Sequence, residues 1–227
     1  MISSFFTGVG SKKLIDIDKI MKMPLWKRKK ELDKAIEWNT AVAKDYHGFA
    51  FFAATDQFVA IAVGQILQLP EINAVYLRES QSQMYSPSAF FLSKWLISTL
   101  VYMLEPIVYG TLSFYSVEVG EVTHYEYKEF MAISILLALT ASSFGYLFST
   151  LFSNDQVALQ IHNGCWGLLY FCSPVFTLIG NRRSIIVDIL EPISPFTYAC
   201  ELYLRCFLRS SSEKARVLEF FGYTKGE

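Results

Sequence analysis

Long apolar stretches separated by short polar segments fill the chain from about residue 48 to residue 179. Between Glu129 and Asp155 there is no Asp, Glu, Lys or Arg, and none lies between Asp155 and Arg182. About 20 helical residues, rising ~1.5 Å each, cross a hydrocarbon core of ~30 Å, so each stretch can cross a bilayer alone. The pattern predicts an all-α fold, a polytopic transmembrane helical bundle.

We expect about four full spans with shorter amphipathic or re-entrant helices around them. The spans are predicted near residues 48–69, 90–117, 130–152 and 157–179, and Pro70 is expected to end the first. Residues 1–45 are expected to be polar and partly helical, and 209–227 form a polar tail. The apolar positions of the first segment suit a short amphipathic helix; they are Leu25, Trp26, Leu32, Ile36 and Trp38.

Composition narrows the function. The chain has 18% charged residues and a net charge of −1, so nothing suggests a nucleic-acid partner. Its four cysteines form neither a CxxC pair nor a disulfide framework. The histidines His47, His124 and His162 are scattered and the acids lie in different loops, so neither a metal site nor a catalytic constellation is expected. We therefore do not expect an enzyme.

The distribution of basic residues bears on topology. Most Lys and Arg residues precede residue 47 or follow residue 180, and only Arg78, Lys94 and Lys128 lie between. The positive-inside rule then places both ends in the cytoplasm.

Residues 78–94 read RESQSQMYSPSAFFLSK. This segment resembles the pattern RE-x4-MYS-x2-AYFL-x-K of the G subfamily (White/pleiotropic drug resistance type) of ATP-binding cassette exporters. Tyr115 and Gly120 resemble its Y-x4-G helix exit, and residues 193–201, ISPFTYACE, resemble its ISPF-x-YA-x-E segment. The three occur in the family order and cover roughly residues 46–208, the expected ABC type-2 transmembrane domain.

The resemblance implies further features. Residues 1–10 would be the end of a first span, 71–89 a coupling helix and 189–208 a re-entrant helix. It places residues 11–45 and 181–227 on the outer side, whereas the positive-inside rule places both ends of the chain in the cytoplasm. We favour the topology that the resemblance implies. The sequence contains no G-x-x-x-x-G-K-[ST] loop, so ATP and Mg²⁺ would bind a nucleotide-binding domain outside it, and the chain itself needs no cofactor. The chain would be a fragment or a truncated relative.

Five residues are coupling-helix candidates by the same resemblance. They are Arg78, Glu79, Met84, Tyr85 and Lys94. In the family this region passes the closure of the motor domains to the spans. The alternative is an interfacial amphipathic linker with a local ion pair.

The first predicted span contains a carboxylate, and its presence within a membrane span requires an explanation. Asp56 in hydrocarbon costs about 3 kcal/mol on translocon scales, so it should face water or a partner helix. Phe52 shares its helix face and Thr55 lies beside it. The stretch resembles the family's FF-x-x-TNQ, which lines the central cavity, and an Asp there favours cationic or polar cargo over neutral sterols. A hydrogen bond between helices within one subunit is the alternative.

Two other spans contain candidate polar positions. Asn163, Gly167 and Tyr170 form one stripe of a helix, which resembles the cavity side of the family's fifth span; close helix packing is the alternative. Glu105 precedes Pro106 in the second span, where it would titrate during transport or make a structural polar contact.

The resemblance implies the membrane part of an ATP-driven exporter of lipids, sterols or other amphipathic small molecules. It would form half of a dimeric pathway, homo- or heterodimeric, and take a nucleotide-binding domain in cis or in trans. The lipid bilayer is the other partner, and the plasma membrane is favoured. A truncated, non-transporting protein that assembles with or regulates full-length relatives is the alternative.

Overall fold

The computed structural model describes residues 15–22, 25–81, 85–116, 124–152, 154–173 and 189–208. Every regular element in this part of the chain is helical, which confirms the predicted all-α class. The elements are, in order, α2 (Ile17–Met21), α3 (Leu25–Gln81), α4 (Pro87–Ser116), α5 (His124–Leu151), α6 (Asp155–Phe171), η1 (Glu191–Ile193) and α9 (Pro195–Phe207). The predicted segments 1–10 and 209–227 lie outside the described residues.

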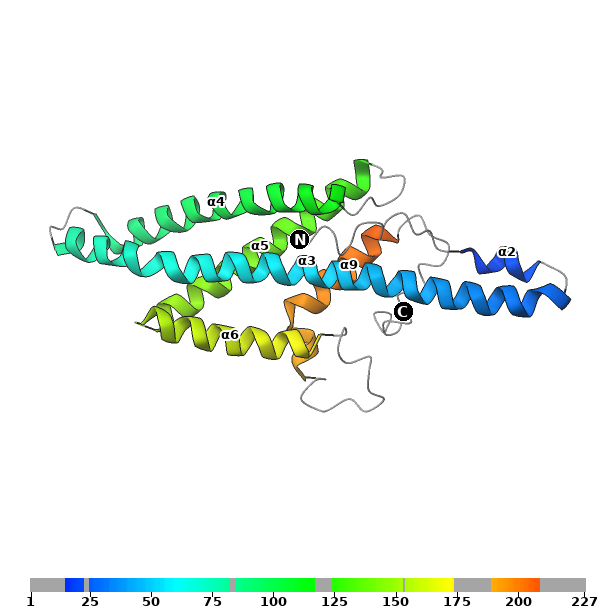
Figure 1. Cartoon of the computed structure of the whole chain (residues 1–227). Helices are drawn as coiled ribbons and strands as arrows, with labels where there is room; N and C mark the ends of the chain where they lie inside the picture. The colour runs from blue at the N-terminus through cyan, green and yellow to red at the C-terminus, as the bar shows by residue number, and fades with distance from the viewer. Residues whose placement is uncertain are drawn as a thin grey trace.

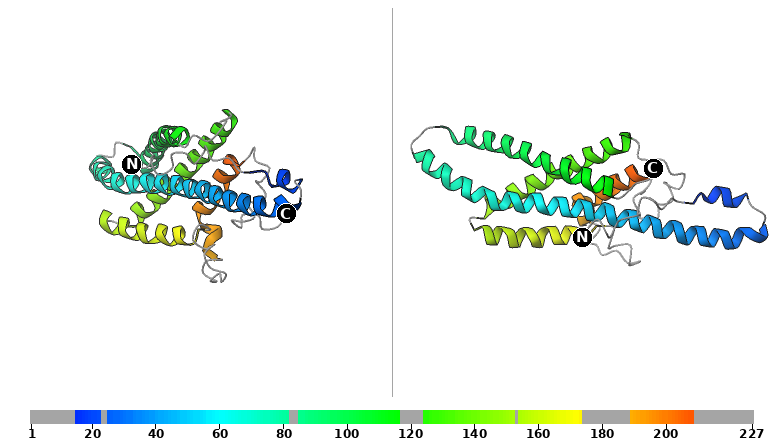
Figure 2. Two further views of the ribbon diagram at one scale, coloured as in Figure 1. Left: turned by 45° about the vertical axis from the view of Figure 1, so that its right-hand side comes forward. Right: turned by 45° about the horizontal axis from the view of Figure 1, so that its top comes forward.

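Helix α3 is the axis of the molecule (Figure 1). It is 57 residues long, about 85 Å at ~1.5 Å per residue. Helices α4 and α6 run along opposite sides of it, while α5 and α9 cross it, and its N-terminal part extends beyond the bundle with α2 beside it (Figures 1 and 2). This arrangement leaves one long face of α3 between α4 and α6.

Three of the described helices are long and apolar enough to cross a membrane: Arg28–Gln81 within α3, Pro87–Tyr115 within α4 and Tyr127–Leu151 within α5. The predicted fourth span differs, because α6 has 17 residues and ends at Phe171 rather than near residue 179. Residues 174–188, which follow, lie outside the described part. Asn154 starts α6 as its N-cap, with its side chain accepting a hydrogen bond from the Gln156 backbone N–H at 2.9 Å.

Pro70 does not end the first span, so that expectation is wrong: α3 continues through it to Gln81. A proline cannot donate to the carbonyl four residues earlier, here that of Ile66. The Ser149 hydroxyl of α5 donates to that carbonyl at 3.5 Å. Neighbouring helices commonly supply such bonds in membranes. The predicted coupling helix 71–89 is therefore split between the last turns of α3 and the start of α4.

Helices α3 and α5 meet at very close range. A Cβ on Gly145 would lie 2.6 Å from the Gln65 Cβ and 2.7 Å from the Ala62 carbonyl oxygen, so only glycine fits there. Ala138, Ala141 and other small residues of α5 are also buried. Small residues let helix backbones approach, which is how helices associate in lipid.

Buried polar groups tie α5 to two other helices. The Gln57 amide of α3 donates to the Ser134 carbonyl oxygen at 2.8 Å. The Ser134 hydroxyl lies 2.8 Å from the hydroxyl of Tyr203 on α9. All three side chains are buried, so these bonds fix α3, α5 and α9 relative to one another.

The N-terminal part of α3 is helical as expected, but its buried face is not the predicted one. Ile36 and Trp38 are exposed, whereas Asn39 is buried. Both atoms of the Asn39 amide bond the backbone of Ile15, at 2.7 Å each, and hold α2 against α3. Tertiary contact with the preceding segment therefore decided which face is covered.

Candidate functional site

A pocket of about 260 Å³ lies between α3 and α6. Its lining residues are Phe51, Phe52, Thr55, Asp56 and Val59 of α3, and Trp166 and Tyr170 of α6. Four of the six predicted cavity residues, Phe52, Thr55, Asp56 and Tyr170, therefore surround one space. Their function as a cargo site is untested by this geometry and stays a prediction.

Aromatic rings form most of the pocket wall. The Phe51 and Tyr170 rings lie 4.6 Å apart, centroid to centroid, and join α3 to α6. Trp166 meets Tyr170 edge to face at 5.5 Å. The Trp166 indole N–H donates to the Asn163 side-chain oxygen at 3.1 Å, which fixes the orientation of the indole. The rings are thus held by contacts of their own.

Polar groups line the pocket on α3. The Thr55 hydroxyl donates to the Phe51 carbonyl oxygen at 2.8 Å, so its own oxygen is left as an acceptor. Asp56 is partly buried, and Tyr109 of α4 interacts with its carboxylate through a hydrogen bond. Glu105, one helical turn before Tyr109, adds a second acid close enough to Asp56 for electrostatic interaction. The two predicted roles of Glu105, titration during transport and a structural polar contact, both stay predictions.

The two remaining predicted cavity residues lie on the open side of α6. Asn163 is exposed apart from its contact with Trp166. Gly167 has nothing within 4 Å of the position that a Cβ would take, and neither does Gly164. The packing alternative for these glycines is not realised within the described chain, since no described neighbour comes close to them.

The corner between α3 and α4 holds the predicted coupling residues. The Tyr85 hydroxyl donates a hydrogen bond to the Glu79 carboxylate. The pKa of Tyr85 is raised to about 12, and this hydrogen bond is the largest cause. The rings of Tyr76 and Phe90 stack at 4.4 Å and close the corner. Arg78 is exposed. Glu79 therefore has Tyr85 as one hydrogen-bond partner, and the coupling function of this corner stays a prediction.

Lys94, another coupling candidate, lies near the start of α4 and is partly buried. Met84 is outside the described residues.

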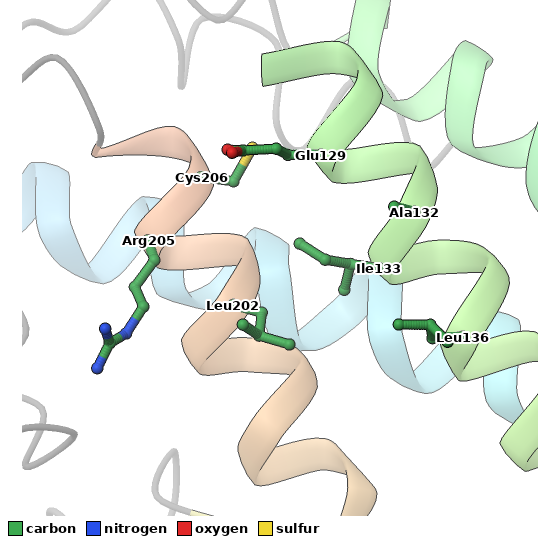
Figure 3. A pocket seen from close by; sticks show the side chains of 7 residues that line it. All are labelled: Glu129, Ala132, Ile133, Leu136, Leu202, Arg205 and Cys206. Atoms are coloured by element: carbon green, nitrogen blue, oxygen red, sulfur yellow. The ribbon is translucent and has the colours of Figure 1, made fainter. Parts of the chain in front are cut away.

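A larger crevice of about 530 Å³ lies elsewhere, between α5 and α9 (Figure 3). Ile133 and Leu136 of α5 face Leu202 of α9 there, and Glu129 lies near Cys206 at one end (Figure 3). The Arg205 side chain is directed away from α5 and pairs with Glu201 at 2.6 Å. No residue that the sequence singled out lines this crevice, and its aliphatic walls suit contact with lipid.

Sequence reasoning missed three residues of the α3–α6 site. Phe51 was read only as part of a motif, and Trp166 and Tyr109 were not considered. Trp166 precedes Tyr170 by four positions, so helical spacing alone would have placed it on the same face. Tyr109 had no such signal, because its proximity to Asp56 depends on how α4 packs on α3.

Three long apolar helices, each able to cross a membrane, define an integral, multi-pass membrane protein. The family model described as ABC-2 type transporter matches residues 20–208. The chain therefore belongs to the ABC-2 type transporter family.

A relative supports the same family. Over 100 residues, 43% of this chain, the sequence is 30% identical to the ABC transporter ATP-binding protein/permease wht-1 of Caenorhabditis elegans. The matched part spans 15% of the length of that relative.

Proposed function

We propose that this chain is the membrane-spanning part of an ATP-driven exporter of the G-subfamily type, which moves lipids, sterols or other amphipathic small molecules. The observation that carries the proposal is the α3–α6 pocket, which joins apolar walls to a carboxylate on a helix long and apolar enough to cross a membrane. A mixed lining of this kind suits a molecule with an apolar body and a polar end. The relative named above is by its name both an ATP-binding protein and a permease, which supports ATP as the energy source.

The pathway lies between two membrane halves. On α6 the pocket is lined by Trp166 and Tyr170, and Gly167, which lies between them in the sequence, has no neighbour within 4 Å of the position that a Cβ would take. A second copy or a related half that packs near this face would enclose the pocket and complete the pathway.

Energy enters at the α3–α4 corner. The Glu79–Tyr85 bond and the Tyr76–Phe90 stack make this corner a defined projection at the end of two long helices. The exposed Arg78 guanidinium is free to dock on acidic residues of a nucleotide-binding domain, in cis or in trans. Movement of that domain would then shift α3 and α4 together.

ATP-dependent uptake into inside-out vesicles tests the proposal. The full chain is expressed with the nucleotide-binding protein that copurifies with it, and uptake of a fluorescent phospholipid analogue is measured. We expect uptake that requires ATP and falls in Arg78→Ala, with Lys30→Ala on the exposed N-terminal part of α3 as the matched control. Absence of both a nucleotide-binding partner and uptake would contradict the proposal and favour a non-transporting partner of full-length relatives.

The dimeric pathway needs its own test. Gly164→Cys and Gly167→Cys are expected to cross-link two membrane halves through α6, whereas a cysteine at Leu136 on the outer side of α5 is not. Equal cross-linking at Gly164, Gly167 and Leu136 would contradict an interface at α6.

A further inference from the structure

We infer that the α3–α6 pocket recognises an organic cation: it takes the ammonium group of an amphipathic amine or quaternary ammonium compound. The inference rests on the proposed function and names the chemical class of its cargo. It combines three properties of the pocket, which are its charge, its aromatic wall and its size.

The charge comes from Asp56. This carboxylate lies in a helix that is long and apolar enough to cross a membrane, where an isolated charge is costly. No Lys, Arg or His is among the residues that line the pocket. The one described hydrogen bond to the carboxylate comes from Tyr109, which is neutral, so the negative charge is solvated but not balanced.

The aromatic wall supplies the second property. Phe51, Phe52, Trp166 and Tyr170 all line the pocket, and two of their contacts hold the rings at centroid distances of 4.6 and 5.5 Å. Aromatic faces attract ammonium groups, and the attraction is largest where the cation loses its water. A carboxylate beside several rings is the combination that distinguishes an ammonium from an uncharged group of the same shape.

The size limits what enters. At about 260 Å³ the pocket lies below the ~300–1,000 Å³ of sites that enclose a whole drug-sized ligand. It therefore holds the polar end of the cargo. The apolar remainder would extend into the space beside α6, where Gly167 has no neighbour within 4 Å of the position that a Cβ would take.

Equilibrium binding to the full chain in nanodiscs tests the inference without nucleotide. Two probes are compared: a dansyl-labelled alkyl trimethylammonium compound, and its analogue in which a tert-butyl group replaces the trimethylammonium. The two have the same shape and differ in charge. We expect wild-type protein to bind the ammonium probe at least tenfold more tightly, a difference of about 1.4 kcal/mol.

Substitutions test which residues cause the preference for the ammonium probe. Asp56→Asn is expected to remove it by weakening the ammonium probe alone, and Tyr170→Leu to reduce it severalfold. Asp33→Asn, the same change on an exposed part of α3, is the matched control and should leave both affinities unchanged. Equal binding of the two probes by wild-type protein, or a preference that survives Asp56→Asn, would overturn the inference. Because the wild-type comparison needs no substitution, a misfolded variant does not weaken the test.

The result is separable from that of the transport experiment. Vesicle uptake of the phospholipid analogue together with equal probe binding would overturn the cation preference and leave ATP-driven transport standing. Ammonium selectivity without ATP-driven uptake would support the pocket as a site for organic cations and count against the proposed exporter function.

Discussion

Helix α3 has two faces that are built in opposite ways. Toward α5 it is packed so closely that a single Cβ on Gly145 would collide with it, and its buried amide at Gln57 is hydrogen-bonded. Toward α6 it leaves a pocket, and the glycines of α6 have open space in front of them. Glycine thus has different uses in the two helices. The comparison separates a fixed scaffold, α3 with α5 and α9, from a more open contact where a ligand or a partner can be accommodated.

The largest effect is expected at the closest contact. Gly145→Leu places a branched side chain where even a Cβ lies 2.6 Å from its neighbour, so the helices must separate. Overpacking costs about 1–3 kcal/mol and occasionally more, and here the obstacle includes backbone. We expect loss of the folded, monodisperse protein in fluorescence-detected size-exclusion chromatography. A Gly145→Leu protein with wild-type thermal stability would show that the close α3–α5 contact does not exist.

Adjacent residues of α3 give the next test, because Gln57 belongs to the scaffold and Asp56 to the site. Gln57→Leu leaves the buried Ser134 carbonyl without this donor and should destabilise the protein by about 1–3 kcal/mol. Asp56→Asn should change the unfolding free energy by less than Gln57→Leu, because the amide oxygen can still accept the hydrogen bond from Tyr109. Thermal unfolding in one detergent compares the two directly. The reverse order of effects would contradict the assignment of faces.

A smaller effect is expected on the open side of α6. Gly164→Ala and Gly167→Ala meet no neighbour, and alanine favours a helix over glycine by about 1 kcal/mol. Each should leave the isolated chain equally stable or slightly more stable, in contrast to any substitution at Gly145. A clear loss of melting temperature at either position would show that this face is already packed.

The smallest effect on stability is expected at the α3–α4 corner. Tyr85→Phe keeps the ring that stacks near Phe90 but removes the bond to Glu79. Because the corner is exposed, the melting temperature should change less than in Gln57→Leu. ATP-driven uptake should nevertheless fall while probe affinity is unchanged, if this corner transmits movement. Unchanged uptake would show that the corner only connects α3 to α4 and does not transmit movement.

Much of the site followed from helical spacing. Phe52, Thr55 and Asp56 lie close together in sequence, and Tyr170 on another helix was singled out by resemblance; the structure brings them to one pocket. The crowding of Glu105 and Tyr109 near Asp56 could not be foreseen, because it depends on the register of α4 against α3. Likewise, Gly145 carries no signal that distinguishes it from Gly167 in the sequence.

What the sequence determined by itself is the class of the molecule. Uncharged stretches long enough to cross a bilayer require helices, since a backbone in lipid must satisfy its own hydrogen bonds. Tertiary structure decided the rest. The Ser149 hydroxyl of α5 meets the carbonyl that Pro70 leaves free, so α3 runs on where the sequence predicted an end. Contacts between distant segments decide which glycine is crowded, which face of α3 is covered and which acids lie close together. The local sequence pattern carries no information about these contacts.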